Sequence, residues 1–296
     1  MNKEYKKLLP DWYLNEHEMV LSNDIDSLAS CALLKKINNW EIKYFYDFEK
    51  VYKITGHTEK KEKCWVDVAI QSGHAFDNHV SRLSLYDEWN KDMINLNQTS
   101  MITNDNYSDK YAGSTLLEIW SLYDVPLPKT EIGKMILLAI DVSFKGFYST
   151  NFHDIQKYYL VDILGFKELY NVINRHEKEE FYDVITKYGL NADIICEDGE
   201  LKSRLKLERI GKLLDLDLTL PEEEFEVIEE LEIIEEDIQK YHNSLDDVCI
   251  DIRTAALTYR NKLRYSKVHR KVGRRASNYL EFLKIIGVKT CTYADE

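Results

Sequence analysis

The sequence predicts an α/β fold in which a mainly parallel sheet is flanked by helices and is followed by a smaller, helix-rich α/β domain. The first half of the chain alternates short apolar runs with stretches of helical periodicity, a pattern typical of parallel sheets. The chain has 296 residues, 44% of them hydrophobic, which is enough for two domains. Turn-forming residues gather at 191–200. We therefore expect domains at 1–190 and 191–296.

The elements of the first domain follow from hydrophobic periodicity. Apolar runs bounded by polar residues predict strands, and apolar residues three and four apart predict helices. The first helix is expected to have Asp26 or Ser27 as its N-cap. The expected strands are Glu18–Ser22, Ile42–Tyr46 and Lys63–Ile70, and the expected helices are Asp26–Lys36 and Tyr111–Tyr123.

The remainder of the chain has a more helical pattern. Lys134–Val142 is apolar and fits a helix that runs into the end of a strand. Pro221 suits a first helical position, so we expect a long helix after it, and Ile285–Tyr293 fits a last strand. Residues 152–190 are expected to be helical, with a buried stripe of Tyr159, Ile163, Phe166, Leu169 and Val172; the stripe expected after Pro221 is Phe225, Ile228, Leu231, Ile238 and Tyr241.

The charge is distributed unevenly along the chain. The net charge is −13, yet Arg253 to Arg275 contains nine Lys or Arg residues and no acid, while Glu222 to Asp237 contains ten acids and no base. Tyrosines lie between the cations of the basic segment, and this combination suits a phosphate backbone with stacked bases. A solvated helix face, or a partner for the acidic segment, is the alternative.

Composition also indicates the compartment. No apolar stretch reaches the roughly 20 residues that cross a membrane, and the N-terminal residues lack a signal-peptide pattern. Five scattered cysteines without a C-x-x-C pair argue against a disulfide framework and against a zinc site. We expect a cytoplasmic protein with reduced thiols and no membrane partner.

Acidic residues and a histidine follow the predicted strand ends. Ligands of open α/β sheets bind beyond the carboxyl ends of the strands. Carboxylates that converge there repel one another, and a divalent cation removes that penalty; oxygen and imidazole ligands suit Mn²⁺ or Mg²⁺ better than zinc. The residues are Asp24 and Asp26 after the first strand, Asp67 in WVDVAI, Asp77 and His79 in HAFDNHVS, and Asp141 at the end of ILLAID.

Each acid taken alone has a simpler explanation. A strand-end Asp is more often a helix N-cap than a ligand. Asp67 is harder to explain in this way, because apolar residues flank it and an unpaired buried acid is costly. The set as a whole therefore predicts a metal site.

The ordered motifs resemble those of the DHH phosphoesterases, the RecJ-like and nanoRNase-like enzymes. NDIDSLASCALL resembles the family's first motif, an Asp-x-Asp that opens a helix, and WVDVAI resembles the second. FDNHVS resembles the Asp-His-His motif, and LLAIDVSFKGFYS resembles the fourth. YAGSTLLEIWSLYDVPLP resembles the helix that precedes the fourth motif. The resemblance covers about residues 17–150, with the motifs in family order.

The resemblance implies a two-metal site that holds Mn²⁺ or Mg²⁺. Asp67 would bridge two ions about 3.5–4 Å apart. Asp77 and His79 would be catalytic residues, with His79 contacting the scissile phosphate or a metal. The implied metal ligands are Asp24, Asp26, Asp67 and Asp141.

The chain departs from the family pattern in three respects. Asn78 replaces the first histidine of the Asp-His-His motif and is expected to offer a neutral oxygen as a metal ligand, which binds more weakly than imidazole. His74 is the candidate for the missing nitrogen ligand, with a structural or surface histidine as the alternative. The upstream histidine or acid of some members is Val20 or Ser22 here. The glycine-rich substrate loop is absent; the substrate-binding residues expected in its place are Arg264, Arg270, Arg274 and Arg275.

These features predict a Mn²⁺- or Mg²⁺-dependent phosphodiesterase that hydrolyses a nucleotide, a short oligonucleotide or a nucleic-acid end. The alternative is a catalytically inactive DHH-like module that binds a nucleotide or a protein. An inorganic pyrophosphatase of the same superfamily is less favoured, because the missing histidines are the ones it would use. The oligomeric state stays open, with a homo-oligomer among the options.

Overall fold

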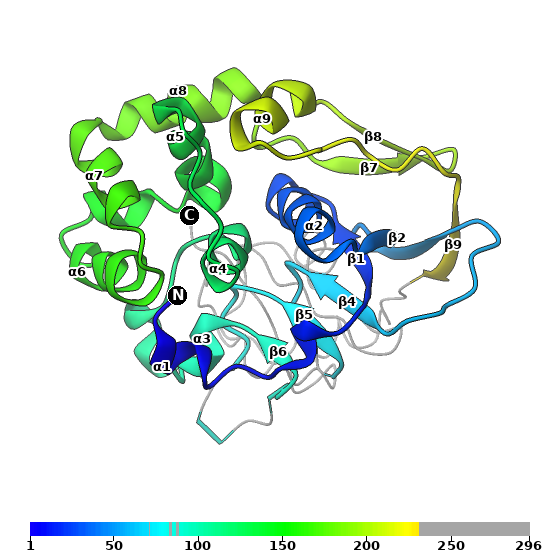
Figure 1. Cartoon of the computed structure of the whole chain (residues 1–296), viewed down its shortest axis with the longest axis horizontal. Helices are drawn as coiled ribbons and strands as arrows, with labels where there is room; N and C mark the ends of the chain where they lie inside the picture. The colour runs from blue at the N-terminus through cyan, green and yellow to red at the C-terminus, as the bar shows by residue number, and fades with distance from the viewer. Residues whose placement is uncertain (71, 83–84, 87–88, 231–296) are drawn as a thin grey trace, which may run out of the picture.

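A seven-stranded mixed sheet forms the centre of the computed structural model, which describes residues 1–70, 72–82, 85–86 and 89–230 (Figure 1). The strand order is β6-β5-β4-β1-β2-β3-β9. The strands from β6 to β2 are parallel to one another. Strands β3 and β9 extend the sheet beside β2 through antiparallel pairing. The expected α/β class with a mainly parallel sheet is confirmed. The strands are β1 (Glu18–Ser22), β2 (Glu41–Tyr46), β3 (Lys50–Ile54), β4 (Lys63–Val66), β5 (His74–Phe76), β6 (Met93–Ile94) and β9 (Phe225–Glu230).

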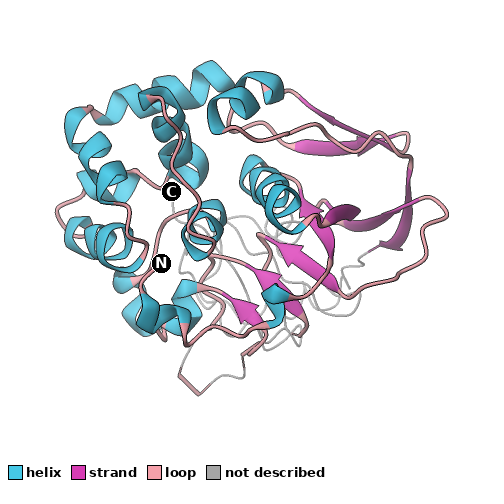
Figure 2. Cartoon of the chain, in the orientation of Figure 1, coloured by secondary structure: helices cyan, strands magenta, loops and turns pink. Residues whose placement is uncertain are grey.

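Helices flank this sheet and gather at one end of the molecule (Figure 2). Helix α5 lies at the centre of the helical part and packs against α7, α8 and α9. The α-helices are α1 (Lys3–Lys6), α2 (Ile25–Asn38), α3 (Leu96–Thr99), α4 (Thr115–Leu122), α5 (Glu131–Ala139), α6 (His153–Lys157), α7 (Lys167–Arg175), α8 (Lys178–Tyr188) and α9 (Leu207–Leu214). The shorter turns are η1 (Trp12–Leu14), η2 (Asn104–Asp109), η3 (Ile140–Val142), η4 (Lys145–Tyr148) and the π-helical η5 (Tyr158–Ile163).

The first strands lie where the sequence predicts them, with one correction. Strand β1 has the expected bounds, and β2 begins one residue early, at Glu41. Strand β4 is shorter than expected, because it ends at Val66. Asp67 follows it in the left-handed region, with φ 62°. The lone acid of WVDVAI therefore lies at a strand end and not within a strand.

Helix α2 packs on the parallel strands and is buried along most of its length. Its N-cap is Asp24, not Asp26 or Ser27, because residue 24 has the extended backbone of a cap and accepts a 3.0 Å hydrogen bond from the Ser27 N–H. The Ser27 hydroxyl accepts from the N–H of Ser22 and donates to the carbonyl of Val66, both at 2.8 Å. This hydroxyl joins the ends of β1 and β4 to the start of α2.

The two helices expected after residue 110 are present with different ends. Helix α4 begins at Thr115 and not at Tyr111, because the Ser114 side chain caps it by accepting from the N–H of Leu117 at 3.1 Å. The apolar run at 134–142 forms the end of α5 and then the turn η3, not a strand end. Asp141 lies in this turn with φ 49°.

The helical expectation for residues 152–190 is confirmed. Helices α6, α7 and α8 and the turn η5 occupy this stretch. The predicted stripe faces the core, since its members are all buried: Tyr159, Ile163, Phe166, Leu169 and Val172.

Two expectations after residue 190 are wrong. The connection expected at 191–200 contains the first strand of a hairpin, β7 (Ile194–Glu197) with β8 (Glu200–Ser203). The helix expected after Pro221 is the strand β9 as far as residue 230, with Ile228 exposed. Strand β9 pairs with β3, where Glu226 lies opposite Lys53, and this long-range partner supplies the hydrogen bonds that decide its conformation.

Several expectations concern the chain beyond residue 230. Leu231, Ile238, Tyr241 and the strand expected at Ile285–Tyr293 lie outside the described residues. The domain boundary at 190 and the C-terminal domain stay predictions. Cys31, Cys64 and Cys196 are free thiols. None of the helices in the described part of the chain has the length and the apolar character that a membrane crossing requires.

The central position of α5 predicts a large effect of truncating its buried face. Leu138 is fully buried, so Leu138→Ala should lower the free energy of unfolding by about 2–5 kcal/mol through lost burial and a cavity. The control Leu14→Ala removes a side chain that is 72% exposed and should change it by less than about 0.5 kcal/mol. Urea unfolding followed by circular dichroism measures both. Equal effects would contradict this packing.

Candidate metal centre

Four neighbouring parallel strands are each followed by a polar residue at the same edge of the sheet. Asp67, Asp77 and Asn95 come directly after β4, β5 and β6, and Asp24 lies two residues after β1. These strands are adjacent in the order β6-β5-β4-β1, and neighbouring strands lie roughly 4.8 Å apart, so the four residues come from one end of four adjacent strands. Ligand atoms of Asp67, Asp77 and His79 lie within 4.8 Å of one another.

Asp26 joins this row from the first turn of α2. Its two carboxylate oxygens accept hydrogen bonds from the backbone N–H groups of Thr115 and Leu116, both at 2.8 Å. These N–H groups are the unpaired donors at the start of α4, where the helix dipole favours a negative charge. Asp26 therefore holds α4 against α2 and adds its charge to the centre.

Asp67 is turned into the centre by the left-handed backbone after β4. It is buried, and its Oδ1 accepts a 2.8 Å hydrogen bond from the Thr115 hydroxyl. Its N–H donates to the carbonyl of Phe76 at 2.8 Å, which extends the pairing of β4 with β5. The same residue of α4 thus contacts both Asp26, through its backbone, and Asp67, through its side chain.

Asp77 and His79 form a tight pair. The imidazole Nδ1 of His79 lies 2.7 Å from Oδ1 of Asp77. The other oxygen of Asp77 accepts from the side-chain amide of Asn95 at 2.7 Å and from the N–H of His79 at 3.1 Å. The Asn95 amide also donates to the carbonyl of His79 at 2.8 Å, so Asn95 holds both ends of the motif.

Asn78 and Asp141 close the centre on the side of η3. The Asn78 amide nitrogen donates to Asp141 at 2.8 Å and to the carbonyl of Gly113 at 2.7 Å. The Asn78 side chain is buried, yet its oxygen accepts no hydrogen bond from any described residue. Asp141 is open to solvent on one side.

Burial and, after it, mutual repulsion raise the pKa values of these acids. Burial, followed by the charge of Asp67, raises the pKa of Asp26 well above its ordinary value. Burial and then the charge of Asp24 do the same to the pKa of Asp67. Protein atoms crowd Asp141 on its inner side, and this desolvation raises its pKa to about 6. Protons or a cation must therefore compensate the charge of the centre.

His79 supplies part of that compensation. Burial by itself lowers the pKa of His79. The charge of Asp77, its hydrogen bond and the more distant acids outweigh burial and raise this pKa to about 10. In the metal-free centre His79 is a cation at neutral pH.

The donor set fits a hard divalent cation. The carboxylates of Asp24, Asp67 and Asp141 and the unpartnered oxygen of Asn78 are oxygen donors, which suit Mn²⁺ or Mg²⁺. The Asn78 oxygen is one of several buried oxygens without a donor among the described residues, and it belongs to a side chain that contacts Asp141, where a cation could bind it.

One predicted ligand and the predicted substrate residues lie elsewhere. His74 begins β5, whereas the centre lies beyond the last residue of that strand, so His74 is at the opposite edge of the sheet and contacts Glu62. His74 and His79 lie at opposite ends of β5, so their two rings do not come together. Arg264, Arg270, Arg274 and Arg275 lie outside the described residues.

Sequence reasoning missed the residues that support the centre. Asn95 follows a strand of only two residues, which carries no recognisable periodicity. Thr115 follows a Ser that could be recognised as a helix cap, but the contacts of Thr115 with Asp26 and Asp67 depend on packing between distant segments.

A pocket of about 280 Å³ opens beside the centre. Asn78, His79 and Asp141 line one side of it. Other lining residues combine cations with aromatic rings and come from the segment before α4 and from the helical part: Lys110, Lys145, Tyr148, Phe152 and Lys178.

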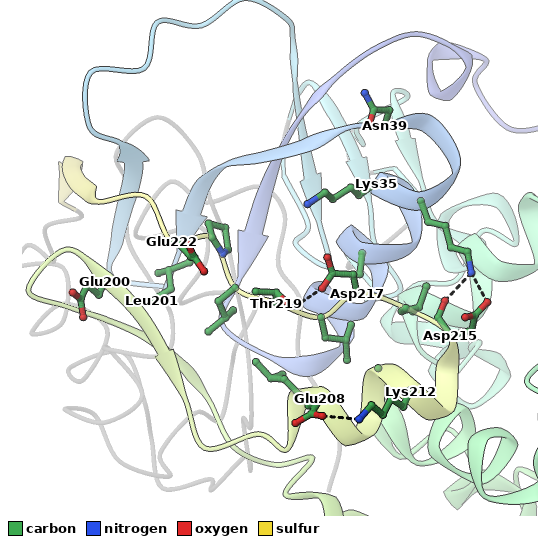
Figure 3. Close-up of a pocket in the computed structure, with 18 residues that line it drawn as sticks. Lys35, Asn39, Glu200, Leu201, Glu208, Lys212, Asp215, Asp217, Thr219 and Glu222 are labelled. Carbon is green, nitrogen blue, oxygen red and sulfur yellow. Dashed lines mark hydrogen bonds and ion pairs between the residues drawn. The ribbon is translucent and has the colours of Figure 1, made fainter.

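A larger hollow of about 1200 Å³ lies between α2, α9 and residues 215–222 (Figure 3). Lys36 pairs with Asp215 at 2.7 Å across it, and Lys212 pairs with Glu208 at 2.6 Å along α9. None of the strand-end acids lines this hollow, so the candidate metal chemistry belongs to the smaller pocket.

Comparisons with known proteins return no match among protein-family models, curated proteins or solved structures.

Proton release should accompany metal binding at this centre. Because the pKa of Asp141 is raised to about 6, its proton is bound at pH 5 and must leave before the carboxylate ligates a cation. We expect Mn²⁺ affinity to rise steeply from pH 5 to pH 7. Calorimetric titration in two buffers of different protonation enthalpy measures affinity and released protons together. In Asp141→Asn the rise should be shallower; an identical rise in both proteins would contradict the assignment.

Asn95 should matter for metal affinity although it is not a ligand. Asn95→Ala removes the donor to Asp77 and to the carbonyl of His79, and the loss of such an outer partner should weaken Mn²⁺ binding by about 10–100-fold. Asn171→Ala, on the exposed side of α7, is the matched control and should bind as the parent protein does. Circular dichroism verifies folding. A folded Asn95→Ala protein with unchanged affinity would refute this role.

Proposed function

We propose that this chain is a divalent-metal-dependent phosphodiesterase with a DHH-like arrangement, acting on a nucleotide or a short oligonucleotide. One observation carries the proposal: Asn78, His79 and Asp141, which belong to the acidic centre, also line a pocket that contains three lysines and the aromatic rings of Tyr111, Tyr148 and Phe152. Acids alone favour a cation, and lysines beside them favour a ligand with negative charge. A phosphoester held against a metal satisfies both.

The proposed division of labour begins with the acids. Asp24, Asp67 and Asp141 would hold Mn²⁺ or Mg²⁺, two ions if the family arrangement applies. Ions at such a site lower the pKa of a bound water and stabilise the charge that develops during in-line displacement. Asp26 keeps α4 in place, and the Thr115 hydroxyl keeps Asp67 oriented.

His79 is proposed to contact the scissile phosphate. Its Nδ1 is held by Asp77 at 2.7 Å, so the ring presents Nε2 as its remaining donor, and His79 lines the pocket. A protonated imidazole donates a charge-assisted hydrogen bond to a phosphoryl oxygen. Asp77 then acts by orienting the ring and keeping its proton.

The pocket is proposed to bind the rest of the substrate. Lys110, Lys145 and Lys178 are point charges suited to phosphate oxygens. Tyr148 and Phe152 offer faces on which a base can stack. At about 280 Å³ the pocket is closer in size to one nucleotide than to a duplex, which favours a mononucleotide unit or a strand end.

A binding-only module is the second candidate, and one observation favours it. Both oxygens of Asp26 and both oxygens of Asp77 already accept hydrogen bonds from the protein. Fewer carboxylates remain for two ions than the family arrangement uses. A single bound ion with no turnover would support this candidate.

The acids provide the decisive test. Asp67→Asn and Asp141→Asn keep the side-chain shape but remove a charge, and each should lower Mn²⁺-stimulated hydrolysis by more than about 100-fold, because the metal contributes several kcal/mol to the transition state. The assay screens cyclic dinucleotides, short RNA, short DNA and adenosine bisphosphate with and without Mn²⁺.

Asp183→Asn, on an exposed position of α8, is the matched control and should hydrolyse at the parent rate. Full activity in Asp67→Asn would reject the proposal. Stoichiometric Mn²⁺ binding without hydrolysis of any of these substrates would favour the binding-only module.

A further inference from the structure

Two histidines and a glutamate meet at the edge of the sheet opposite the candidate metal centre. Ligand atoms of His17, Glu62 and His74 lie within 4.8 Å of one another. We propose that these three residues form a second metal site, selective for a transition metal of the zinc class. This inference is independent of the proposed function, because none of the three lies among the strand-end acids.

The sheet itself places the three residues together. His17 directly precedes β1, Glu62 directly precedes β4 and His74 begins β5, and these strands are adjacent in the order β5-β4-β1 (Figure 1). The N–H of Glu18 donates to the carbonyl of Glu62 at 3.1 Å, so the pairing of β1 with β4 reaches this level.

The three side chains also share a face. Side chains alternate along a strand, so residues two apart point to the same side. Each of the three lies two residues before a buried member of one hydrophobic cluster; those members are Met19, Cys64 and Phe76. His74 lies opposite Cys64, two residues further along the strands than Glu62, so the adjacent strands and the common face bring the three side chains together without a special loop.

His17 has the surroundings of a metal-bound histidine. It is 2% exposed, and its Nε2 lies 3.0 Å from the carbonyl of Trp12. Metal-ligating histidines generally donate their other N–H to such a carbonyl, which fixes the tautomer and the ring orientation. Nδ1 of His17 lies 3.3 Å from the backbone carbonyl of Glu62, within hydrogen-bonding distance, and a metal bound at Nδ1 would displace this contact.

His74 is held just as firmly. Its ring stacks on Trp12 with a centroid separation of 4.7 Å and an interplanar angle of 9°. Trp12 also meets the His17 ring edge-on at 5.2 Å, so one indole orients both imidazoles. Nδ1 of His74 lies 3.3 Å from the carboxylate of Glu62.

This donor set contains two imidazole nitrogens, whereas the candidate metal centre at the carboxyl ends of the strands offers mainly carboxylate oxygens. Two imidazoles and one carboxylate suit zinc and its neighbours, and leave a fourth position for water. Metal–ligand bonds of about 2.0–2.1 Å place tetrahedral donors roughly 3.3 Å apart, which is the separation of His74 from Glu62. Glu62 is 76% exposed and can make the remaining adjustment.

A metal at this edge would tie together the starts of β1, β4 and β5. The protein should therefore be more stable when loaded, since a ligand that binds only the folded chain raises its melting temperature.

Co²⁺ titration of the full chain tests the proposal. After treatment with a chelator, the protein is titrated with Co²⁺ in millimolar Mg²⁺, which occupies oxygen sites but competes poorly for imidazole. We expect one Mg²⁺-resistant Co²⁺ per chain, with the intense visible absorption of a low-coordinate Co²⁺ bound by histidine. Zn²⁺ should displace it and raise the melting temperature.

Three variants give the test its specificity. His74→Phe keeps a ring on Trp12 but has no ligand, and should abolish the Co²⁺ band. Glu62→Ala should weaken binding about tenfold or more. Glu16→Ala removes an equally exposed acid that pairs with Lys61 at 2.7 Å, and should leave binding unchanged.

Asp67→Asn distinguishes this site from the candidate metal centre that contains Asp67. This variant should retain the Co²⁺ band whether or not the proposed function is correct. The proposal is overturned if the parent protein shows no Mg²⁺-resistant Co²⁺, or if folded His74→Phe and Glu62→Ala proteins bind it as tightly as the parent.

Discussion

Several carboxylates converge at the carboxyl ends of adjacent parallel strands, where most of them are buried. A buried negative charge is costly unless a donor or a cation compensates it. The first N–H groups of α4 compensate Asp26, and the Thr115 hydroxyl compensates Asp67. His79 compensates Asp77. The position of α4 against α2 is therefore an electrostatic requirement as much as a consequence of apolar packing.

These contacts do not neutralise all the negative charge of the centre. The charge that remains favours the binding of a cation. The raised pKa values of Asp26 and Asp67 mean that the remaining repulsion is relieved by protons or by a metal. The two ends of the parallel strands differ in the ligand atoms that they offer. Carboxylate oxygens at the carboxyl ends of the strands suit hard cations, and the imidazoles of His17 and His74 at the amino ends suit softer cations.

Local pattern was a good guide wherever an element is stabilised by its own neighbours. Strand β1, helix α2 and the helical region after residue 152 lie close to their predicted bounds. Local pattern gave a helix where the structure has β9, because a short apolar run with flanking acids fits the periodicity of a helix and of a strand. Pairing with β3 decided that this segment is a strand. Local pattern failed again at His74, because an extended strand carries residues only a few positions apart to opposite edges of the sheet.

Hydrophobic periodicity is a local property, so the class of the fold and the strand-end acids Asp24 and Asp77 could be predicted from the sequence, whereas Asp67 was expected within a strand. The groups that compensate these acids come from distant segments. Asn95 and Thr115 reach the centre through strand order and helix packing, and these are long-range contacts that no local pattern encodes. The same strand order gathers His17, Glu62 and His74, whose separation along the chain conceals that they are neighbours.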